Sequence, residues 1–297
     1  MKLTPLILAG AALAALASGA SGASRMLDPA VPADALEINK RVQCGAGEGV
    51  PGVYHWSGRA YGRRAGEPDK LLFNLEGMNV RRCVTVTDPK KGVGYRLISR
   101  EVMFYVDAKT GKILRQFENP YTGKTVDVMQ VANDPVNSRP SFAMSDDGTP
   151  VTMNLQRSGD LAMLAMEAPL FYTNPLAGDY QDYVGNKYHA MEIFDFTMNA
   201  RELLDTKYPT AYPAVAWVRI SEWMPWLLMQ GREGQMVFNA VGTKVASFDA
   251  LPPVIKDEIA LNYPIWNAPP PADDARPNAT TWTVFKKQID AKRAAPK

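Results

Sequence analysis

Residues 95–117 read YRLISREVMFYVDAKTGKILRQF and contain two runs rich in β-branched and aromatic residues. The first run, residues 95–107, ends at the polar sequence DAKTGK, and the second covers residues 113–117. Gly111 can adopt the positive φ angle that a tight turn requires. The stretch therefore predicts two antiparallel strands joined by a hairpin turn.

Runs of the same kind recur on both sides of this hairpin. They are separated by turn-forming residues at spacings typical of antiparallel sheets. Gly242, which precedes a further short run at residues 244–248, predicts a second hairpin. The other predicted strands are residues 53–61, 70–80, 126–132, 151–155, 161–172, 187–196, 214–223 and 235–241.

Helical signals are few. Asn199 can cap a short helix over residues 200–204, and the Pro252-Pro253 pair can open another over residues 254–261. Many short strands without intervening helices argue against a doubly wound α/β sheet. The sequence therefore predicts a mainly β fold, an antiparallel β-barrel or a barrel-like sandwich with a few short helices.

The N-terminal 23 residues have the features of a secretory signal peptide. Lys2 precedes an apolar run at residues 3–17, and small residues fill positions 18–23. The run is shorter than the roughly 20 residues that a membrane-spanning helix needs, and no other stretch comes closer. We expect residues 1–23 to be removed and the mature protein to be periplasmic or secreted, without a membrane span.

The mature chain is expected to form one domain with a tail. Hydrophobic residues make up 46% of the sequence, which is enough for a large core, and no repeat or internal linker is recognisable. Residues 24–268 are expected to form a single β-rich domain. Residues 269–297 are expected to form a Pro-rich arm and a helical tail in which Trp282, Phe285 and Ile289 share one face.

Charge and cysteine content limit the possible partners. The 33 basic and 31 acidic residues are mixed along the chain and give a net charge of +2. Because no basic block could follow a phosphate backbone, nucleic acid is not an expected partner. Cys44 and Cys83 could form one disulfide in an oxidising compartment, or they could remain two buried thiols. No feature of the sequence sets the oligomeric state.

Several kinds of catalytic site lack their sequence signatures. His55 and His189 are the two histidines, and no Gly-x-Ser-x-Gly motif is present for a serine hydrolase. His189 and Glu192 have helical spacing but lie in a predicted strand, where they point to opposite faces. The glycine-rich loop at residues 47–52 is not framed by a strand and a helix. We therefore expect neither a metal nor an organic cofactor.

Polar residues within apolar strands are the remaining candidates, because burial without a partner is costly. Asn79 and Arg81 share one face of their strand. Glu101 and Tyr105 share one face of the strand that precedes the first hairpin. These side chains could instead face solvent, so both arrangements remain open.

A second group of polar residues follows in the C-terminal half. Strand alternation places Tyr188 and Glu192 on one face, and the run WVRISEWMPW at residues 217–226 surrounds an arginine and a glutamate with indoles. A carboxyl group pressed against indoles would have a raised pKa and could act as a general acid or base. The arginine could form a purely structural cation–π pair, or it could grip a carboxylate or phenolate of an aromatic ligand. The candidate catalytic residues are Glu192, Glu222 and Tyr188, and the candidate ligand-binding residues here are Arg219, Trp217 and Trp223.

Two loops could add ligand contacts. Residues 119–123 and 133–137 are rich in Asn and Pro, which favour turns, so a structural role is the simpler explanation. In the functional alternative the loops rim the mouth of a barrel. Asn133, Asp134 and Asn137 would then present donors and acceptors to a ligand.

These motifs together resemble a known family. The segments that carry the resemblance are EGMN at 76–79, RE at 100–101, YVD at 105–107, TG at 110–111, NPYTG at 119–123, NDPVN at 133–137 and the run at 217–226. They look like those of the family catalogued as domain of unknown function 1838, over nearly all of the mature chain. The resemblance implies a shared fold and a small-molecule role.

Three functions are consistent with these features. The first is a cofactor-free lyase, isomerase or hydratase that acts on an apolar or aromatic small molecule inside a barrel cavity. The second is a non-catalytic binding protein for such a molecule. The third is a cell-envelope interaction protein with a filled core and an exposed apolar patch. A cavity where Glu192 or Glu222 meets Tyr188 and Arg219 would favour the first.

Overall fold

The main element of the protein, seen in a computed structural model that describes residues 24–180 and 187–294, is a nine-stranded antiparallel sheet. The predicted mainly β, antiparallel character is confirmed. The strand order is β6-β3-β2-β1-β11-β10-β9-β8-β7. The predicted signal peptide, residues 1–23, lies outside the described residues. The strands are β1 (Gly52–Arg63), β2 (Lys70–Asp88), β3 (Gly92–Val106), β6 (Val131–Asn133), β7 (Gln156–Ser158), β8 (Leu161–Thr173), β9 (Lys187–Asn199), β10 (Ala214–Ser221) and β11 (Gln235–Val245).

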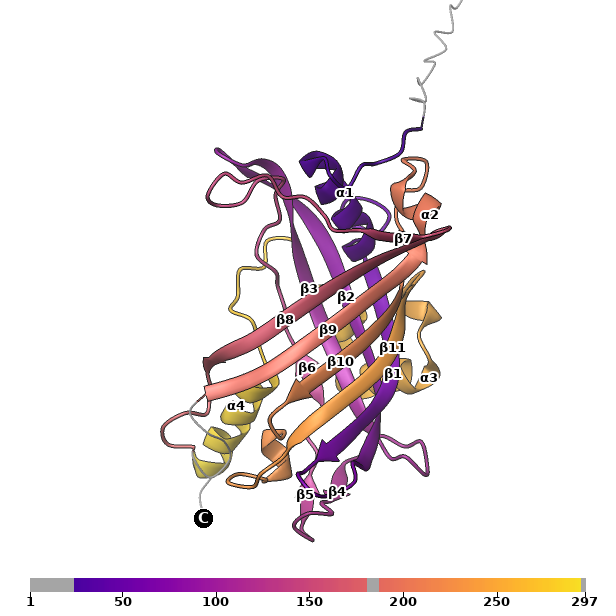
Figure 1. The fold of residues 1–297 in the computed structure, drawn as a ribbon. Helices are drawn as coiled ribbons and strands as arrows, with labels where there is room; N and C mark the ends of the chain where they lie inside the picture. The colour runs from indigo at the N-terminus through magenta and orange to yellow at the C-terminus, as the bar shows by residue number, and fades with distance from the viewer. Residues whose placement is uncertain (1–23, 181–186, 295–297) are drawn as a thin grey trace, which may run out of the picture.

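The sheet curls but does not close. In Figure 1, β8 and β9 cross in front of β2 and β3, so the two halves of the sheet face each other. β6 and β7 are the ends of the strand order, and within the described residues no ladder joins them. β4 (Gln116–Glu118) and β5 (Thr125–Asp127) form a separate two-stranded sheet. The part of the chain described here is therefore an open, curved sheet and not a closed barrel.

The turn within residues 95–117 forms where the sequence predicts it. β3 ends at Val106. The Asp107 N–H donates a hydrogen bond across the turn to the Lys112 carbonyl oxygen (2.8 Å). Gly111 has a φ of +69°, which its lack of a side chain permits. The returning chain makes one isolated bridge, between Val106 and Ile113. The second arm is shorter than predicted because the chain then pairs with β5 instead.

The second predicted hairpin is wrong. β11 runs without a turn through Gly242. A Cβ atom at Gly242 would lie 2.5 Å from the His55 carbonyl oxygen, so this glycine permits the close approach of β1. Residues 151–155 also form no strand, and the short β7 follows them. Glycine is found both in tight turns and where two strands approach closely. From sequence alone, the glycine at position 242 is therefore interpreted as a turn residue although it lies within a strand.

Apolar clusters cover both faces of the sheet. On the inner face, Phe73, Tyr105 and Phe238 pack with Trp226 from a short 3-10 helix (Pro225–Leu227). The outer face of β1 to β3 is covered by α3 (Pro253–Asn262), which lies where the sequence predicts a helix. Removal of this apolar surface from water is the main stabilising contribution to the fold.

The remaining helices pack at the ends and along the side of the sheet (Figure 1). α2 (Ala200–Leu204) begins as predicted at Asn199, whose side chain accepts two backbone N–H hydrogen bonds. α1 (Pro32–Gln43) has no side-chain cap and no counterpart in the prediction. α4 (Thr281–Ala294) is the helical tail, and it buries Trp282.

Cys44 and Cys83 form a disulfide that ties the end of α1 to β2. Both cysteines are buried, and Tyr95 of β3 packs in the same cluster. Of the two states that the sequence leaves open, the structure contains the disulfide. The bond also fixes Gln43, the last residue of α1, beside β2.

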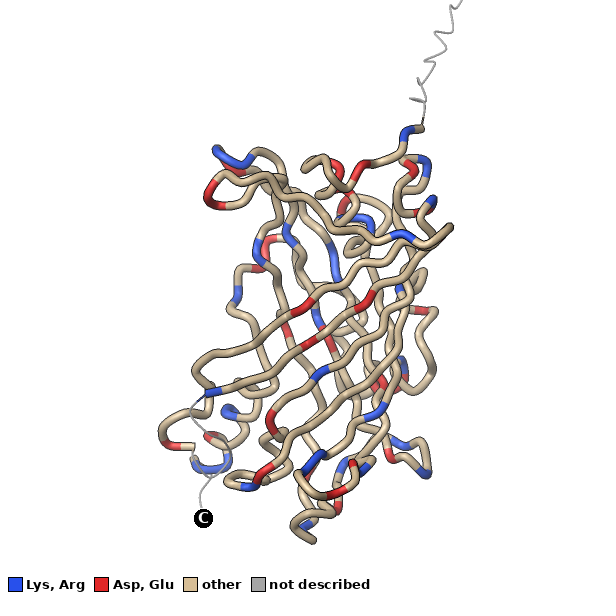
Figure 2. Tube along the Cα trace, viewed as in Figure 1, with Lys and Arg blue, Asp and Glu red and all other residues tan. Residues whose placement is uncertain are grey.

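Charged residues are interspersed over the molecule. In Figure 2, Lys and Arg positions are mixed with Asp and Glu positions along the trace. Some form exposed ion pairs, such as Arg63 with Asp69 (2.7 Å). Within the described residues, no helix combines the length and the apolar character needed to cross a membrane.

Candidate functional site

A cavity of about 470 Å³ lies inside the curved sheet. Side chains from both halves of the sheet line it, together with residues 278–282 at the start of α4. The C-terminal segment therefore completes a wall that the strands leave open. The apolar lining includes Trp56, Met103, Phe194, Val215, Trp217 and Met224.

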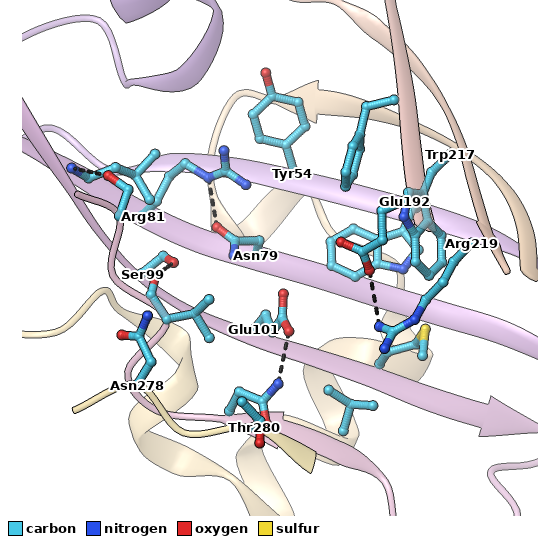
Figure 3. A pocket seen from close by; sticks show the side chains of 18 of the residues that line it. Tyr54, Asn79, Arg81, Ser99, Glu101, Glu192, Trp217, Arg219, Asn278 and Thr280 are labelled. Carbon is cyan, nitrogen blue, oxygen red and sulfur yellow. Dashed lines mark hydrogen bonds and ion pairs between the residues drawn. The ribbon is translucent and has the colours of Figure 1, made fainter. Parts of the chain in front are cut away.

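Arg219 on β10 lies at one end of the cavity, as Figure 3 shows. Its Nη1 donates to Glu192 Oε1 (3.0 Å), because the two residues are register partners on β10 and β9. Its Nη2 donates to the Tyr188 hydroxyl, and Tyr188 packs against Trp282 of α4 with ring centroids 5.1 Å apart. The structure thus brings Tyr188, Glu192 and Arg219 together. Glu192, Arg219 and Trp217 line the cavity, whereas Tyr188 is fully buried and does not line it.

Arg81 on β2 lies at the opposite end of the cavity (Figure 3). Its Nε donates to Asn79 Oδ1 (2.7 Å) and its Nη1 to Gln43 Oε1 (2.6 Å). The guanidinium lies over the ring of Tyr54, 4.6 Å from the centroid. Among the described residues no carboxylate forms an ion pair with Arg81, and burial lowers the pKa of Arg81.

Glu101 on β3 lies between these two groups (Figure 3). Asn133 Nδ2 on β6 donates to Glu101 Oε1 (2.9 Å). Burial raises the pKa of Glu101, the hydrogen bond from Asn133 opposes this effect, and the charge of Glu192 adds to it. Glu101 is therefore protonated more readily than an exposed glutamate.

Glu101→Gln should gain stability relative to the wild type as the pH rises. Because the folded-state pKa of Glu101 is raised above 4.5, the wild type loses stability as pH increases from that value through the raised pKa. Glutamine keeps an acceptor for Asn133 and has no charge to bury. We expect the difference to grow steadily between about pH 4 and about pH 8, measured by urea unfolding.

The control for this prediction is Glu167→Gln, at an exposed position on β8. Its stability should follow that of the wild type at every pH. If Glu101→Gln also followed the wild type, Glu101 would ionise without a cost of burial.

Several polar atoms of cavity-lining residues have no protein partner. Trp56 Nε1, Trp217 Nε1 and Arg219 Nε are buried donors, and Asn133 Oδ1 is a buried acceptor, and none bonds to a described residue. Buried polar groups in proteins are normally hydrogen-bonded. The four groups are exceptions to this rule, and because the protein encloses them almost completely they are not exposed to the cavity.

Glu222 and Trp223 do not line the cavity. Glu222 lies beside His189, and burial raises the pKa of its carboxyl group. Trp223 is buried in the inner apolar cluster and packs against Tyr121, with ring centroids 5.2 Å apart. Both residues follow Ser221, the last residue of β10, so the strand alternation that places Arg219 inside does not extend to them.

The loop at residues 133–137 has a largely structural role. Asp134 does not line the cavity and pairs with two arginines, at N–O distances of 2.7 and 2.8 Å. Asn133 and Asn137 do line it. The Asn137 N–H donates to Asn278 Oδ1 (2.8 Å), and its carbonyl accepts from Asn278 Nδ2 (2.9 Å). The loop thereby holds the C-terminal segment against the sheet.

Metal-ligating side chains do not gather at the cavity. In residues 24–180 and 187–294, no group of three His, Cys, Asp or Glu residues could hold a metal ion. His55 is at the cavity, but its Nε2 is paired with Glu76 (3.0 Å). Besides His55, the charged residues that line the cavity are the arginines and glutamates described above.

A family match covers most of the chain. The family model described as "Protein of unknown function (DUF1838)" matches residues 50–289. The chain belongs to this family. The resemblance seen in the sequence motifs is confirmed, and every cavity-lining residue of this DUF1838 protein except Gln43 lies within the matched range.

Comparison with solved structures gives a weak match to "The crystal structure of Ail, the attachment invasion locus protein of Yersinia pestis". The two chains are 5% identical, and the match covers 67% of this DUF1838 chain and 98% of the other, with a TM-score of 0.19. A likeness at this TM-score carries no argument. A search of curated proteins found no match.

Arg81 and Glu101 are site residues of this DUF1838 protein that the sequence analysis notes as polar residues in apolar strands but assigns no catalytic or ligand-binding role. The signal was present, because each is a charged residue within an apolar strand. Their register partners on the neighbouring strand, Ser99 and Asn79, also line the cavity. Alternation groups such residues on one face, but it cannot tell a cavity from solvent.

Proposed function

We propose that this protein is exported and binds a small apolar or aromatic molecule in the cavity between the two halves of its sheet. A volume of about 470 Å³ supports this, since small-molecule sites usually measure about 300–1,000 Å³. The observation that carries the proposal is the combination of an aromatic and apolar lining with a few fixed charged groups. These are Arg81, Glu101 and the Glu192–Arg219 pair.

A role in envelope interactions has less support. Such a role needs a continuous apolar surface on the outside of the protein. Phe171, Val241 and Leu261 are among the most exposed large apolar side chains, and they lie on β8, β11 and α3. Apolar residues that are spread over three elements do not favour one docking patch.

Catalysis by a cofactor-free lyase, isomerase or hydratase is a second candidate. A carboxyl group with a raised pKa that lies near a buried arginine is suited to proton transfer. Glu101 meets this description. A chemical change in a bound molecule that stops in Glu101→Gln, while binding persists, would distinguish an enzyme from a binding protein.

Filling the cavity should prevent binding. Val215 lines the cavity, whereas Val218 on the same strand points to the opposite face. We expect Val215→Trp to weaken binding of the neutral fluorophore N-phenyl-1-naphthylamine by at least about tenfold. Val218→Trp should leave the affinity within about twofold of the wild type. Fluorescence titration measures both affinities, and circular dichroism verifies that both variants fold.

Native mass spectrometry of the wild type provides a second readout. An organic molecule that is retained by the wild type and by Val218→Trp, but not by Val215→Trp, would identify the chemical class that the cavity accepts. Equal fluorophore binding by the wild type and Val215→Trp would contradict the proposal. Absence of binding in all three proteins would also contradict it.

A further inference from the structure

We infer that the molecule bound in this cavity carries one anionic group and that the Arg81 guanidinium receives it. The inference rests on the proposed function, because it names the class of molecule that the same site would bind. The ligand would be amphipathic, with its anion at Arg81 and its apolar body directed toward Trp217.

Arg81 differs from the other arginine of the cavity in its partners. Arg219 is paired with a carboxylate, Glu192, at 3.0 Å. Arg81 bonds to the amide oxygens of Asn79 and Gln43, and no described carboxylate pairs with it. A cation that is withdrawn from water normally requires a counter-ion. Arg81 is thus a cation whose hydrogen-bond partners in the protein are all neutral.

One N–H edge of Arg81 remains available. Its Nε and Nη1 are used by Asn79 and Gln43, and no described residue accepts a hydrogen bond from Nη2. Arg81 lines the cavity. The two hydrogen bonds and the ring of Tyr54 fix the plane of the guanidinium. An anion would therefore meet a preorganised donor.

Among the described residues, the other charged groups around the cavity do not form an ion pair with Arg81. Arg219 and Glu192 neutralise each other, and His55 bonds to a glutamate that does not line the cavity. Glu101 is the remaining acidic group of the lining, and its charge acts on Arg81, but the two form no ion pair. Because Glu101 is hydrogen-bonded to Asn133 and the partners of Arg81 are amide oxygens, the guanidinium keeps a donor for a ligand anion.

The opposite wall indicates the rest of the ligand. Trp217 packs against Phe194 and Phe238, with ring centroids 6.4 and 5.9 Å apart. Figure 3 places Arg81 and Trp217 on opposite sides of the cavity, with Glu101 between them. A molecule that spans this distance would lay an aromatic or aliphatic body against the rings.

Two fluorophores that share one aromatic skeleton test the inference. 8-Anilinonaphthalene-1-sulfonate carries an anionic group that N-phenyl-1-naphthylamine lacks. We expect Arg81→Met to weaken binding of the sulfonate by at least about tenfold and to leave the neutral compound within about twofold. Arg81→Lys should retain more sulfonate affinity than Arg81→Met, because it keeps the charge. The matched control is Arg59→Met, at an exposed position on β1, which should change neither affinity.

The outcomes separate this inference from the proposed function. If the wild type binds both compounds and Arg81→Met leaves sulfonate affinity unchanged, the anion site is wrong and the small-molecule function stands. If the wild type binds neither compound, both are wrong. If Arg81→Met loses both compounds equally while its circular dichroism matches the wild type, Arg81 shapes the cavity in general and the selective role is overturned.

Discussion

Trp226→Ala should reduce the free energy of unfolding by about 3–5 kcal/mol. Trp226 is 2% exposed, and its ring packs against Phe73, Tyr105 and Phe117, with centroids 5.8, 5.1 and 6.3 Å apart. Truncation removes an indole from the middle of this cluster and leaves a void that the surrounding strands cannot fill. Guanidinium unfolding followed by far-ultraviolet circular dichroism measures the change.

Phe171→Ala is the control for this substitution. Phe171 is 71% exposed on β8, so its truncation should change stability by less than about 1 kcal/mol. If Trp226→Ala lowered the free energy of unfolding by no more than Phe171→Ala, the short 3-10 helix that contains Trp226 would not be part of the core. The position of this 3-10 helix also matters for the site, because the residue just before it, Met224, lines the cavity.

The sequence is most informative where a property depends on strand geometry alone. Successive side chains of a strand point to opposite faces, so Tyr188 and Glu192 could be assigned to one face without knowledge of the fold. The structure has both on the face of Arg219. The cap at Asn199 is predictable for a similar reason, since it depends only on residues within one turn.

Glu222 and Trp223 show where this reasoning ends. The predicted strand continued to residue 223, but the ladder of β10 stops at Ser221. Beyond that point the chain enters the 3-10 helix, and side-chain directions no longer alternate. A strand boundary that is wrong by two residues is therefore sufficient to move two candidate residues out of the site.

The site itself depends on contacts between distant parts of the chain. Gln43 reaches Arg81 across 38 residues, and Asn137 holds Asn278 across 141 residues. These contacts exist because the sheet curls and the C-terminal segment returns to it. Patterns within one strand contain no information about this curl, so Arg81 and Glu101 could be seen as polar residues in strands but could not be assigned to a cavity.

Near neutral pH the Lys244→Met variant should have a higher free energy of unfolding than the wild type. Its free energy of unfolding should also lack the rise with pH that the titration of Lys244 gives the wild type. Lys244 is 4% exposed, and burial lowers the pKa of its ammonium group to about 7. Its Nζ donates to the Arg41 carbonyl (2.9 Å) and to the Thr210 hydroxyl (2.5 Å). Among the described residues no carboxylate pairs with it.

The direction of the pH dependence follows from the lowered pKa. Between about pH 7 and 10.5, the folded protein holds fewer protons at Lys244 than the unfolded chain, so wild-type stability rises with pH across this window. Below about pH 7 both states are protonated, and the full cost of burying the charge is present. Relative to Lys244→Met, the wild type should gain up to about 3 kcal/mol between about pH 7 and about pH 9.5.

Methionine at position 244 leaves the neighbouring carbonyl groups with partners. The Arg41 carbonyl still accepts from Thr210 Oγ1 (3.1 Å), and the Val42 carbonyl accepts from the Tyr54 hydroxyl (2.6 Å). The control is Lys109→Met, at an exposed position in a turn. When urea unfolding is measured across this pH range, its free energy of unfolding should change with pH as that of the wild type does. If the free energy of unfolding of Lys244→Met had the same pH dependence as that of the wild type, Lys244 would keep its proton throughout this range. Its three hydrogen bonds would then outweigh the cost of burying its charge.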